Sequence, residues 1–173
     1  LPGLPVLHLG WAAWPVTVLW LVGLSNAMNL VDGVDGFAGT IAVTAALALG
    51  ACAFVQGRPG AALVAVCLVG ASAGFLAFNF PPARIFMGDS GSRFLGFALA
   101  TLPLMRGPSN PNGATLTLDL AATVAVLGLP VLDTATAITR RLRAGQPIHQ
   151  ADKLHFHHKL QVLGLSDRTL FLV

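Results

Sequence analysis

Long apolar runs are the feature that most restricts what this sequence can fold into. A helix needs roughly 20 mostly apolar residues to cross a bilayer, and five segments reach or approach that length. These segments are residues 11–25, 38–56, 60–78, 92–105 and 118–139. Breaks rich in glycine and proline separate several of them. The pattern predicts an all-α, polytopic membrane protein of about five transmembrane helices, in a single domain over residues 1–173.

The charged side chains are few, and their types are informative. They make up 10% of the sequence, about half the fraction of a typical soluble domain. Glutamate is absent, so all seven acidic residues are aspartates, and aspartates in a membrane protein are rare unless functional. The formal net charge is +3. No basic stripe interleaved with aromatic residues accompanies it, so we expect no nucleic-acid partner.

The basic residues predict which loops face the cytoplasm, because cytoplasmic loops are enriched in lysine and arginine. Arg58 and Arg106 fall on one side of the predicted spans. The other side holds Arg84, Arg93, Arg140, Arg141, Arg143, Lys153, Lys159 and Arg168. We therefore expect loops 26–37, 79–91 and 140–168 to form one cytoplasmic active face. Because the chain begins without a methionine and ends inside an apolar stretch, we also expect the C-terminal half of a larger helical bundle.

The first predicted loop concentrates polar side chains at a membrane boundary. It reads NAMNLVDGVDGF from Asn26 to Phe37 and includes Asn29, Asp32 and Asp35. Aspartates three residues apart share a face where the backbone is helical, and the glycines beside them permit a tight turn or the close approach of a ligand. A solvated turn that caps the next helix is the alternative interpretation.

The second predicted loop combines a helix start with an aromatic ring. It reads FNFPPARIFMGDSGS and includes Asn79, Phe86 and Asp89. Asp89 precedes an apolar run, so it is suited to cap a helix, and a helix N-terminus also binds phosphate oxygens. Phe86 offers a face on which a base could stack, although a lipid-facing phenylalanine is the simpler interpretation.

The third predicted loop is basic and rich in histidine. Its residues Arg141, His155, His157 and His158 suit a diphosphate, because guanidinium groups bind phosphate in a bidentate manner. Zinc binding is less favoured, since HExxH is absent, and an interfacial helix held by anionic lipid is a further alternative. The carboxylates of the other loops would repel a diphosphate on their own, and Mg²⁺, which prefers carboxylates plus substrate phosphates, removes that conflict.

The sequence resembles one known family in three stretches. They read NAMNLVDGVDGFAG, FNFPPARIFMGDSGSRFLG and PVLDTATAITRRLRAGQPIHQADKLHFHHKL, and they are similar to successive signatures of the polyprenyl-phosphate N-acetylhexosamine-1-phosphate transferases. The resemblance implies transfer of N-acetylhexosamine 1-phosphate from a UDP-sugar to polyprenyl (undecaprenyl) phosphate, with release of UMP, as the first membrane step of cell-envelope polysaccharide synthesis. It further implies a multi-pass protein of the inner (plasma) membrane that uses Mg²⁺, with Mn²⁺ as an alternative, and it leaves a homodimer open.

The resemblance also implies a role for individual residues. The catalytic set is Asp32, Asp35, Asp89, His155, His157 and His158. Asp89 would be the principal Mg²⁺ ligand and Asn29 a second, while Asp32 would lie near the diphosphate. The transfer would proceed by direct attack of the lipid phosphate or through a covalent step at an aspartate such as Asp32.

Further residues would bind the substrates. By similarity, Asp35 and Asn79 contact the uracil and Phe86 stacks on it. Arg141 and the three histidines would bind the sugar phosphate and the diphosphate.

Two details of the motifs shape this expectation. The order His-Phe-His-His at 155–158 is similar to the N-acetylglucosamine branch, whereas the phospho-N-acetylmuramoyl-pentapeptide transferases, the alternative, have three consecutive histidines and an acidic residue. The family's upstream pair of aspartates has no counterpart here, so we expect the isolated chain to be inactive in transfer. An inactive truncated fragment, or a scaffold that binds anionic lipid, is the alternative from a different class.

Overall fold

The structure is a bundle of helices. The computed structural model describes residues 9–105, 120–125, 127–128, 131–132, 135–136, 139 and 143. Its elements are η1 (Gly10–Ala12), α1 (Ala13–Val31), α2 (Phe37–Val55), α3 (Pro59–Asn79), α4 (Gly88–Thr101) and η2 (Leu102–Leu104), where η marks a 3-10 helix. No strand occurs among the described residues. The predicted all-α fold is confirmed.

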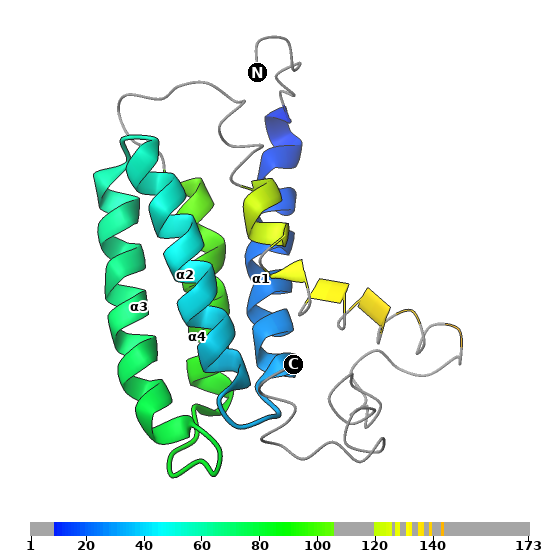
Figure 1. Cartoon of the computed structure of the whole chain (residues 1–173). Coiled ribbons are helices and arrows are strands. Elements are labelled where there is room, and N and C mark those ends of the chain that lie inside the picture. The colour runs from blue at the N-terminus through cyan, green and yellow to red at the C-terminus, as the bar shows by residue number, and fades with distance from the viewer. Residues whose placement is uncertain are drawn as a thin grey trace.

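The helices alternate in direction, which brings two connections to one end of the bundle (Figure 1). In that view α1 and α3 descend, whereas α2 and α4 ascend. The connections 32–36 and 80–87 therefore both lie at the lower end, and the connection between α2 and α3 lies at the upper end. We call the lower end the loop end of the bundle.

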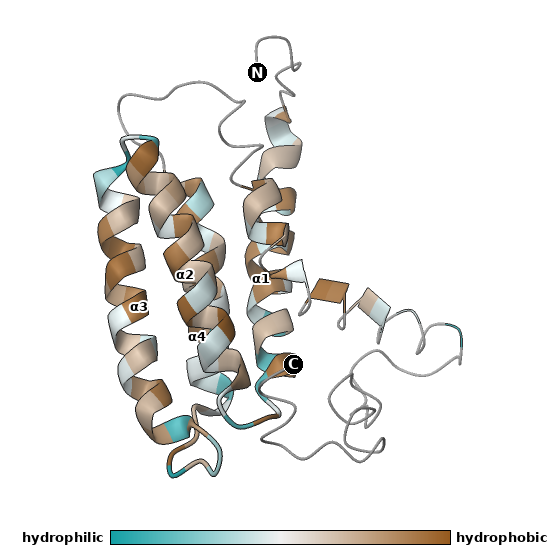
Figure 2. Ribbon diagram, viewed as in Figure 1, coloured by the Kyte–Doolittle hydropathy of each residue, from teal (hydrophilic) through white to brown (hydrophobic). Residues whose placement is uncertain are grey.

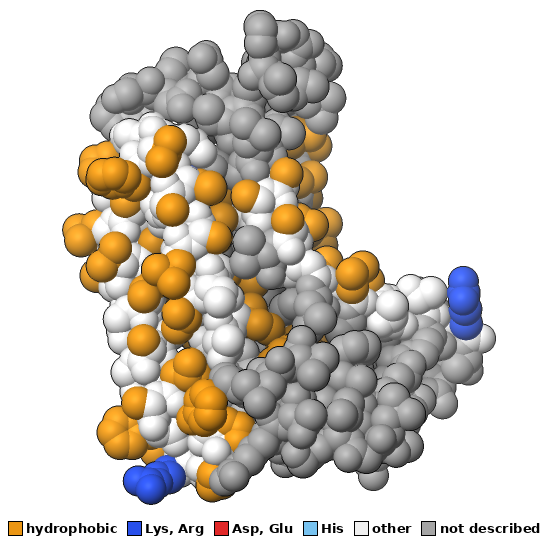
Figure 3. Space-filling model, in the orientation of Figure 1, with side chains coloured by type: hydrophobic (Ala, Val, Ile, Leu, Met, Phe, Trp, Pro, Cys, Tyr) orange, Lys and Arg blue, Asp and Glu red, His pale blue; other side chains and the backbone are white. Residues whose placement is uncertain are grey.

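The helices are long and apolar enough for a membrane protein. Among the described residues, three helices qualify as candidate spans, Gly10–Val31, Phe37–Val55 and Pro59–Asn79. Residues of high hydropathy are frequent along these helices (Figure 2). Hydrophobic side chains are spread over the face of the helices that Figure 3 shows, and Phe54, for example, is 77% exposed. Such a surface is a liability in water but suits contact with lipid. The protein is a polytopic membrane protein, as predicted.

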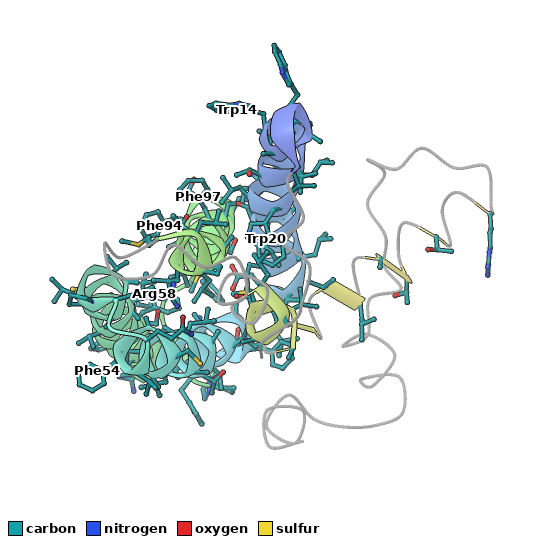
Figure 4. The ribbon with its side chains drawn as sticks, turned by 90° about the horizontal axis from the view of Figure 1, so that it is seen from above. Trp14, Trp20, Phe54, Arg58, Phe94 and Phe97 are labelled. Carbon is teal, nitrogen blue, oxygen red and sulfur yellow. The ribbon has the colours of Figure 1, made fainter. Side chains whose placement is uncertain are left out.

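Aromatic residues mark the opposite end of α1. Trp11 and Trp14 are 94% and 80% exposed, and Trp14 projects from the far end of the helix in Figure 4. Tryptophan is enriched at membrane interfaces, where its ring is apolar and its N–H reaches polar groups. This end of α1 has the side chains expected at a bilayer surface.

The largest differences from the predicted spans lie at the end of α1 and at both ends of α4, which ends at Thr101. α1 continues to Val31 rather than ending at Ser25, and α4 begins at Gly88 rather than at Ser92. Residues that were expected in loops are therefore helical, because their polar groups bind a neighbouring helix: the Asn29 side chain of α1 donates to Ser92 Oγ of α4 at 3.0 Å. α4 has 14 residues, fewer than the three candidate spans. Only part of the predicted span 118–139 lies within the described residues.

Small residues let the helices approach one another closely. α2 packs mainly on α3, and α1 packs mainly on α4. The side chains of Ala42, Ala46 and Ala65 are buried between these elements, and small residues are typical of helix interfaces in membranes. At Gly96 of α4, an added Cβ would lie 2.7 Å from the Leu24 carbonyl oxygen and 2.7 Å from Ser25 Cα of α1. The α1–α4 contact therefore requires glycine at this position.

Candidate functional site

A polar pocket of about 220 Å³ opens at the loop end of the bundle. The end of α1, the connection 32–36, the end of α3 and the start of α4 form its walls. The lining residues are Asn29, Asp32, Gly33, Val34, Asp35, Asn79, Phe86, Met87, Gly88 and Asp89. Two predicted loops that are far apart in the sequence thus build one site.

The turn into α2 depends on a glycine. Gly36 precedes α2 with φ +75°, a left-handed conformation that side chains with a Cβ rarely adopt. The Gly36 N–H donates to Asn79 Oδ1 at 2.9 Å in a buried hydrogen bond. The Asn79 side-chain nitrogen donates to the Ile85 carbonyl oxygen at 2.8 Å. Asn79 is only 5% exposed. Its amide therefore ties the turn before α2 to the connection that follows α3.

Asp35 makes a second link between the same two connections. Its Oδ2 accepts a hydrogen bond from the Ala83 backbone N–H at 3.0 Å. Hydrogen bonds that involve a charged group are stronger than neutral ones. Together, Asp35 and Asn79 hold the two connections in register, and both residues line the pocket.

A polar network joins α1 to α4 at the pocket rim. One guanidinium nitrogen, Arg93 Nη2, donates to Asn29 Oδ1 at 3.1 Å and to Asp89 Oδ2 at 3.2 Å. Ser92 Oγ accepts from the Asn29 side chain and donates to the Gly88 carbonyl oxygen at 3.1 Å. The side chains of Arg93 and Asp89 are 50% and 75% exposed, so their ion pair contributes little stability by itself. The Arg93 guanidinium instead holds the side chains of Asn29 and Asp89 close to each other.

Asp32 carries a negative charge in an unfavourable place. Burial, and then the negative charge of Asp89, raise the pKa of Asp32 from 3.8 to about 6. Desolvation and a like charge both disfavour the ionised carboxylate. The pocket therefore brings together two carboxylates that repel each other when both are ionised.

The pocket offers oxygen atoms of the kind that a magnesium ion prefers. Asp32, Asp89 and Asn29 offer carboxylate and amide oxygens, the ligands that Mg²⁺ prefers together with substrate phosphates. A divalent cation would also offset the burial and the negative charge of Asp89, which together raise the pKa of Asp32. Among the described residues, no cluster of three or more histidine, cysteine or acidic residues could hold a metal by itself. A site of this composition would need the phosphates of a ligand to complete it.

The pocket gathers the predicted site residues of the first two loops. Phe86 lines it with a ring that is 76% exposed, which leaves a face open for stacking. Arg141, His155, His157 and His158 lie outside the described residues. Arg93 was not among the predicted site residues, although it contacts both Asn29 and Asp89. Its spacing of four residues from Asp89 was the available signal, since such pairs meet on a helix.

The helices and the pocket define a polytopic membrane protein with a polar, carboxylate-containing site at one end of its bundle. Residues 1–107 match the family described as Glycosyl transferase family 4. This match covers more than half of the 173-residue chain. The chain belongs to this family, and the family predicted from the motifs is confirmed.

Named relatives agree with this assignment. The chain is 41% identical over 166 residues to the probable undecaprenyl-phosphate N-acetylglucosaminyl 1-phosphate transferase of Bacillus subtilis (strain 168), across 96% of this chain and 45% of the relative. It is 40% identical over 175 residues to the decaprenyl-phosphate N-acetylglucosaminephosphotransferase of Mycobacterium tuberculosis (strain ATCC 25618 / H37Rv), across 91% and 43%. It is 35% identical over 171 residues to the phospho-N-acetylmuramoyl-pentapeptide-transferase of Streptococcus pneumoniae (strain ATCC BAA-255 / R6), across 96% and 48%. The chain spans just under half the length of these relatives.

Proposed function

We propose that the protein transfers N-acetylglucosamine 1-phosphate from its UDP derivative to a polyprenyl phosphate and releases UMP. The printed names of the relatives from Bacillus and Mycobacterium support this reaction. The excess of basic residues on the side of the pocket supports a site at the cytoplasmic face of the plasma membrane. UDP-N-acetylglucosamine and the lipid phosphate are the two substrates.

The observation that carries the proposal is the composition of the pocket. Asp32, Asp89 and Asn29 lie beside the exposed ring of Phe86 in one cavity. Two carboxylates, one of them with a pKa raised by burial and by the other's charge, suit a cation bound with a diphosphate. An exposed aromatic ring suits a nucleobase. A nucleoside diphosphate joined to a sugar combines these two chemical groups.

The chain's own residues orient the reacting groups. The Phe86 ring stacks on the uracil, while Asp35 and Asn79 keep the two connections around the base in register. A phosphate oxygen of the lipid attacks the sugar-bearing phosphorus, and the bond from this phosphorus to the oxygen of UMP breaks. Mg²⁺ held by Asp89 and Asn29 would neutralise the diphosphate and the departing UMP. Arg93 would release the Asn29 and Asp89 oxygens that it contacts.

A transfer assay tests the reaction. Membranes that contain this sequence within an intact protein that also carries the family's upstream aspartate pair are mixed with UDP-N-acetylglucosamine labelled in the sugar, polyprenyl phosphate and Mg²⁺, and labelled lipid and UMP are measured. The isolated chain should give neither product. We expect both products from the intact protein, and we expect Asp89→Asn to abolish transfer without changing insertion into the membrane. Transfer by the variant within about tenfold of the parent, a barrier change of roughly 1.4 kcal/mol, would contradict the metal role of Asp89.

The same assay separates the alternatives. UDP-N-acetylmuramoyl-pentapeptide as the better donor would move the protein to the branch of the Streptococcus relative. If neither donor gave labelled lipid, the proposed transfer would be contradicted. A protein that is only a scaffold would also show no Mg²⁺-dependent protection by UMP.

A further inference from the structure

Arg93 of α4 contacts both of the side chains that the proposed function assigns to the metal. Its Nη2 donates to Asn29 Oδ1 at 3.1 Å and to Asp89 Oδ2 at 3.2 Å. Amide and carboxylate oxygens of this kind are also the atoms that bind Mg²⁺. One positively charged group of the chain itself therefore binds oxygen atoms that a divalent cation would use.

The backbone at Arg93 is held in place, whereas its guanidinium is free to move. The Arg93 carbonyl oxygen accepts a hydrogen bond from Ser25 Oγ of α1 at 2.8 Å. The Arg93 side chain is 50% exposed, and it also borders a mainly apolar cavity of about 420 Å³ that residues of α1 and α4 line. The guanidinium therefore has room to withdraw from the polar pocket while α4 stays packed on α1.

The Asn29 amide, by contrast, has a fixed orientation. Its nitrogen donates to Ser92 Oγ at 3.0 Å, so its oxygen is the end that meets Arg93. Withdrawal of the Arg93 guanidinium would leave this oxygen in place. Asn29 can therefore exchange one cation for another without turning its side chain.

A divalent cation and the guanidinium compete for these oxygen atoms. Mg²⁺ binds its ligands at about 2.1 Å, so a cation bonded to Asn29 Oδ1 would lie within about 5 Å of Arg93 Nη2. Two positive charges at this separation repel each other. Binding of the metal therefore favours withdrawal of Arg93 from Asn29 and Asp89.

We propose that Arg93 competes with the metal for Asn29 and Asp89 and thereby makes cation binding depend on a nucleoside diphosphate. The identity of this ligand rests on the proposed function, whereas the competition rests on the contacts of Arg93. A diphosphate offers anionic oxygens to the cation and to the withdrawn guanidinium. The nucleotide therefore favours the exchange of Arg93 for the metal, and the metal alone binds weakly.

Binding of Mn²⁺ without nucleotide tests the competition. Mn²⁺ stands in for Mg²⁺ because its EPR signal distinguishes free from bound ion, and it is titrated into the purified protein in detergent. We expect Arg93→Gln to bind Mn²⁺ about three to ten times more tightly than the parent, because an exposed ion pair and a hydrogen bond no longer oppose binding. Arg84→Gln is the matched control, since it removes the same charge from an exposed residue of the connection 80–87. It should change the Kd far less.

A second titration, with UDP, separates direct competition from a general effect of charge. The Kd for Mn²⁺ is measured again at saturating UDP, after correction for the Mn²⁺–UDP complex that forms in solution. Loss of a distant charge would shift this Kd by the same factor with and without UDP. We expect the gain in Mn²⁺ affinity that UDP causes to be about three to ten times smaller in Arg93→Gln than in the parent, and to be unchanged in Arg84→Gln.

Arg93→Met guards against a folding defect in Arg93→Gln. Methionine keeps the apolar stem with which arginine packs, and the ion pair that it removes is exposed and contributes little stability. We expect the Tm without ligands to stay close to that of the parent. Arg93→Met should then bind Mn²⁺ as tightly as Arg93→Gln does.

Other results would overturn the proposal. Unchanged or weaker Mn²⁺ binding in Arg93→Gln and Arg93→Met would show that Arg93 does not compete with the cation. An equal gain in Arg84→Gln would show a general effect of charge, and an unchanged effect of UDP would show that the nucleotide does not act through Arg93. If UDP changed Mn²⁺ binding in none of these proteins, the nucleotide site of the proposed function would fail. The titration without nucleotide would still decide whether Arg93 competes with the metal.

Discussion

Asn79 at the end of α3 accepts a hydrogen bond from the backbone N–H of Gly36 before α2, with 2.9 Å between nitrogen and oxygen. The other end of the same amide donates to the Ile85 carbonyl oxygen at 2.8 Å. Both polar atoms of this buried side chain are thus used in joining two connections. The uracil contact inferred from the resemblance remains a prediction, and the bracing role is what the geometry shows.

Replacing Asn79 tests the bracing role. Asn79→Ala leaves the Gly36 N–H without its acceptor, and a buried donor that loses its partner costs about 1–3 kcal/mol. We expect a lower Tm in detergent and a weaker Mg²⁺-dependent effect of UMP. Asn26→Ala, which truncates an exposed asparagine on α1, should change the free energy of unfolding by less than about 0.5 kcal/mol. Equal stability of the two variants would contradict the bracing role.

Because the pKa of Asp32 is raised, we expect the stability of the protein to depend on pH in an unusual way. Its pKa is about 6 in the folded protein and 3.8 as an ordinary aspartate, so between these values the folded state binds more protons than the unfolded state. The contribution of Asp32 to stability therefore falls as the pH rises from about 4 to about 6. Without divalent cations, Asp32→Asn should raise the Tm at pH 7.5 and leave it unchanged near pH 3.5. A Tm difference that is the same at both pH values would contradict the charge argument.

At Gly96, where α4 contacts α1, we expect no side chain larger than that of glycine to fit without strain. Gly96→Ala would place a Cβ 2.7 Å from backbone atoms of Leu24 and Ser25, and overpacking of this kind typically costs about 1–3 kcal/mol. Gly70→Ala is the matched control, because a Cβ there meets nothing within 4 Å. We expect Gly96→Ala alone to lower the Tm. A drop of the same size in both variants would point to a general intolerance of alanine.

We expect the ring of Phe86 to stabilise bound nucleotide by stacking on its base. Base stacking on an aromatic ring contributes about 1–3 kcal/mol, so Phe86→Leu should weaken UMP binding by roughly 5- to 150-fold. Phe54→Leu changes a ring of equal exposure, 77% against 76% for Phe86, on the apolar surface of α2. It should leave the Kd for UMP unchanged. An unchanged Kd in Phe86→Leu would favour the simpler interpretation of a lipid-facing ring.

The sequence predicts the helical class and the gathering of most pocket residues, because both depend on local signals. Apolar run length identifies the helices, and the alternation of their directions brings Asp32 and Asp89 to one end. The helical position of Asn29 is a different case, since its amide is satisfied by Ser92 on a helix far along the chain. The hydropathy of the sequence cannot predict a hydrogen bond between side chains of two helices that are far apart in the sequence. The roles of Arg93 and Gly96 also depend on the α1–α4 contact and emerge only from the structure.

Binding of UMP with and without Mg²⁺ examines the metal and nucleotide pocket separately from the transfer reaction. The Tm of the purified protein is measured with UMP, with Mg²⁺ and with both, for the parent, for Asp89→Asn and for Ser90→Ala as the control at the neighbouring exposed position. We expect the Tm to rise in the parent and in Ser90→Ala only when both UMP and Mg²⁺ are present, and we expect no rise in Asp89→Asn. A rise with UMP that does not depend on Mg²⁺ or on Asp89, or no rise at all, would contradict a metal and nucleotide site in this pocket.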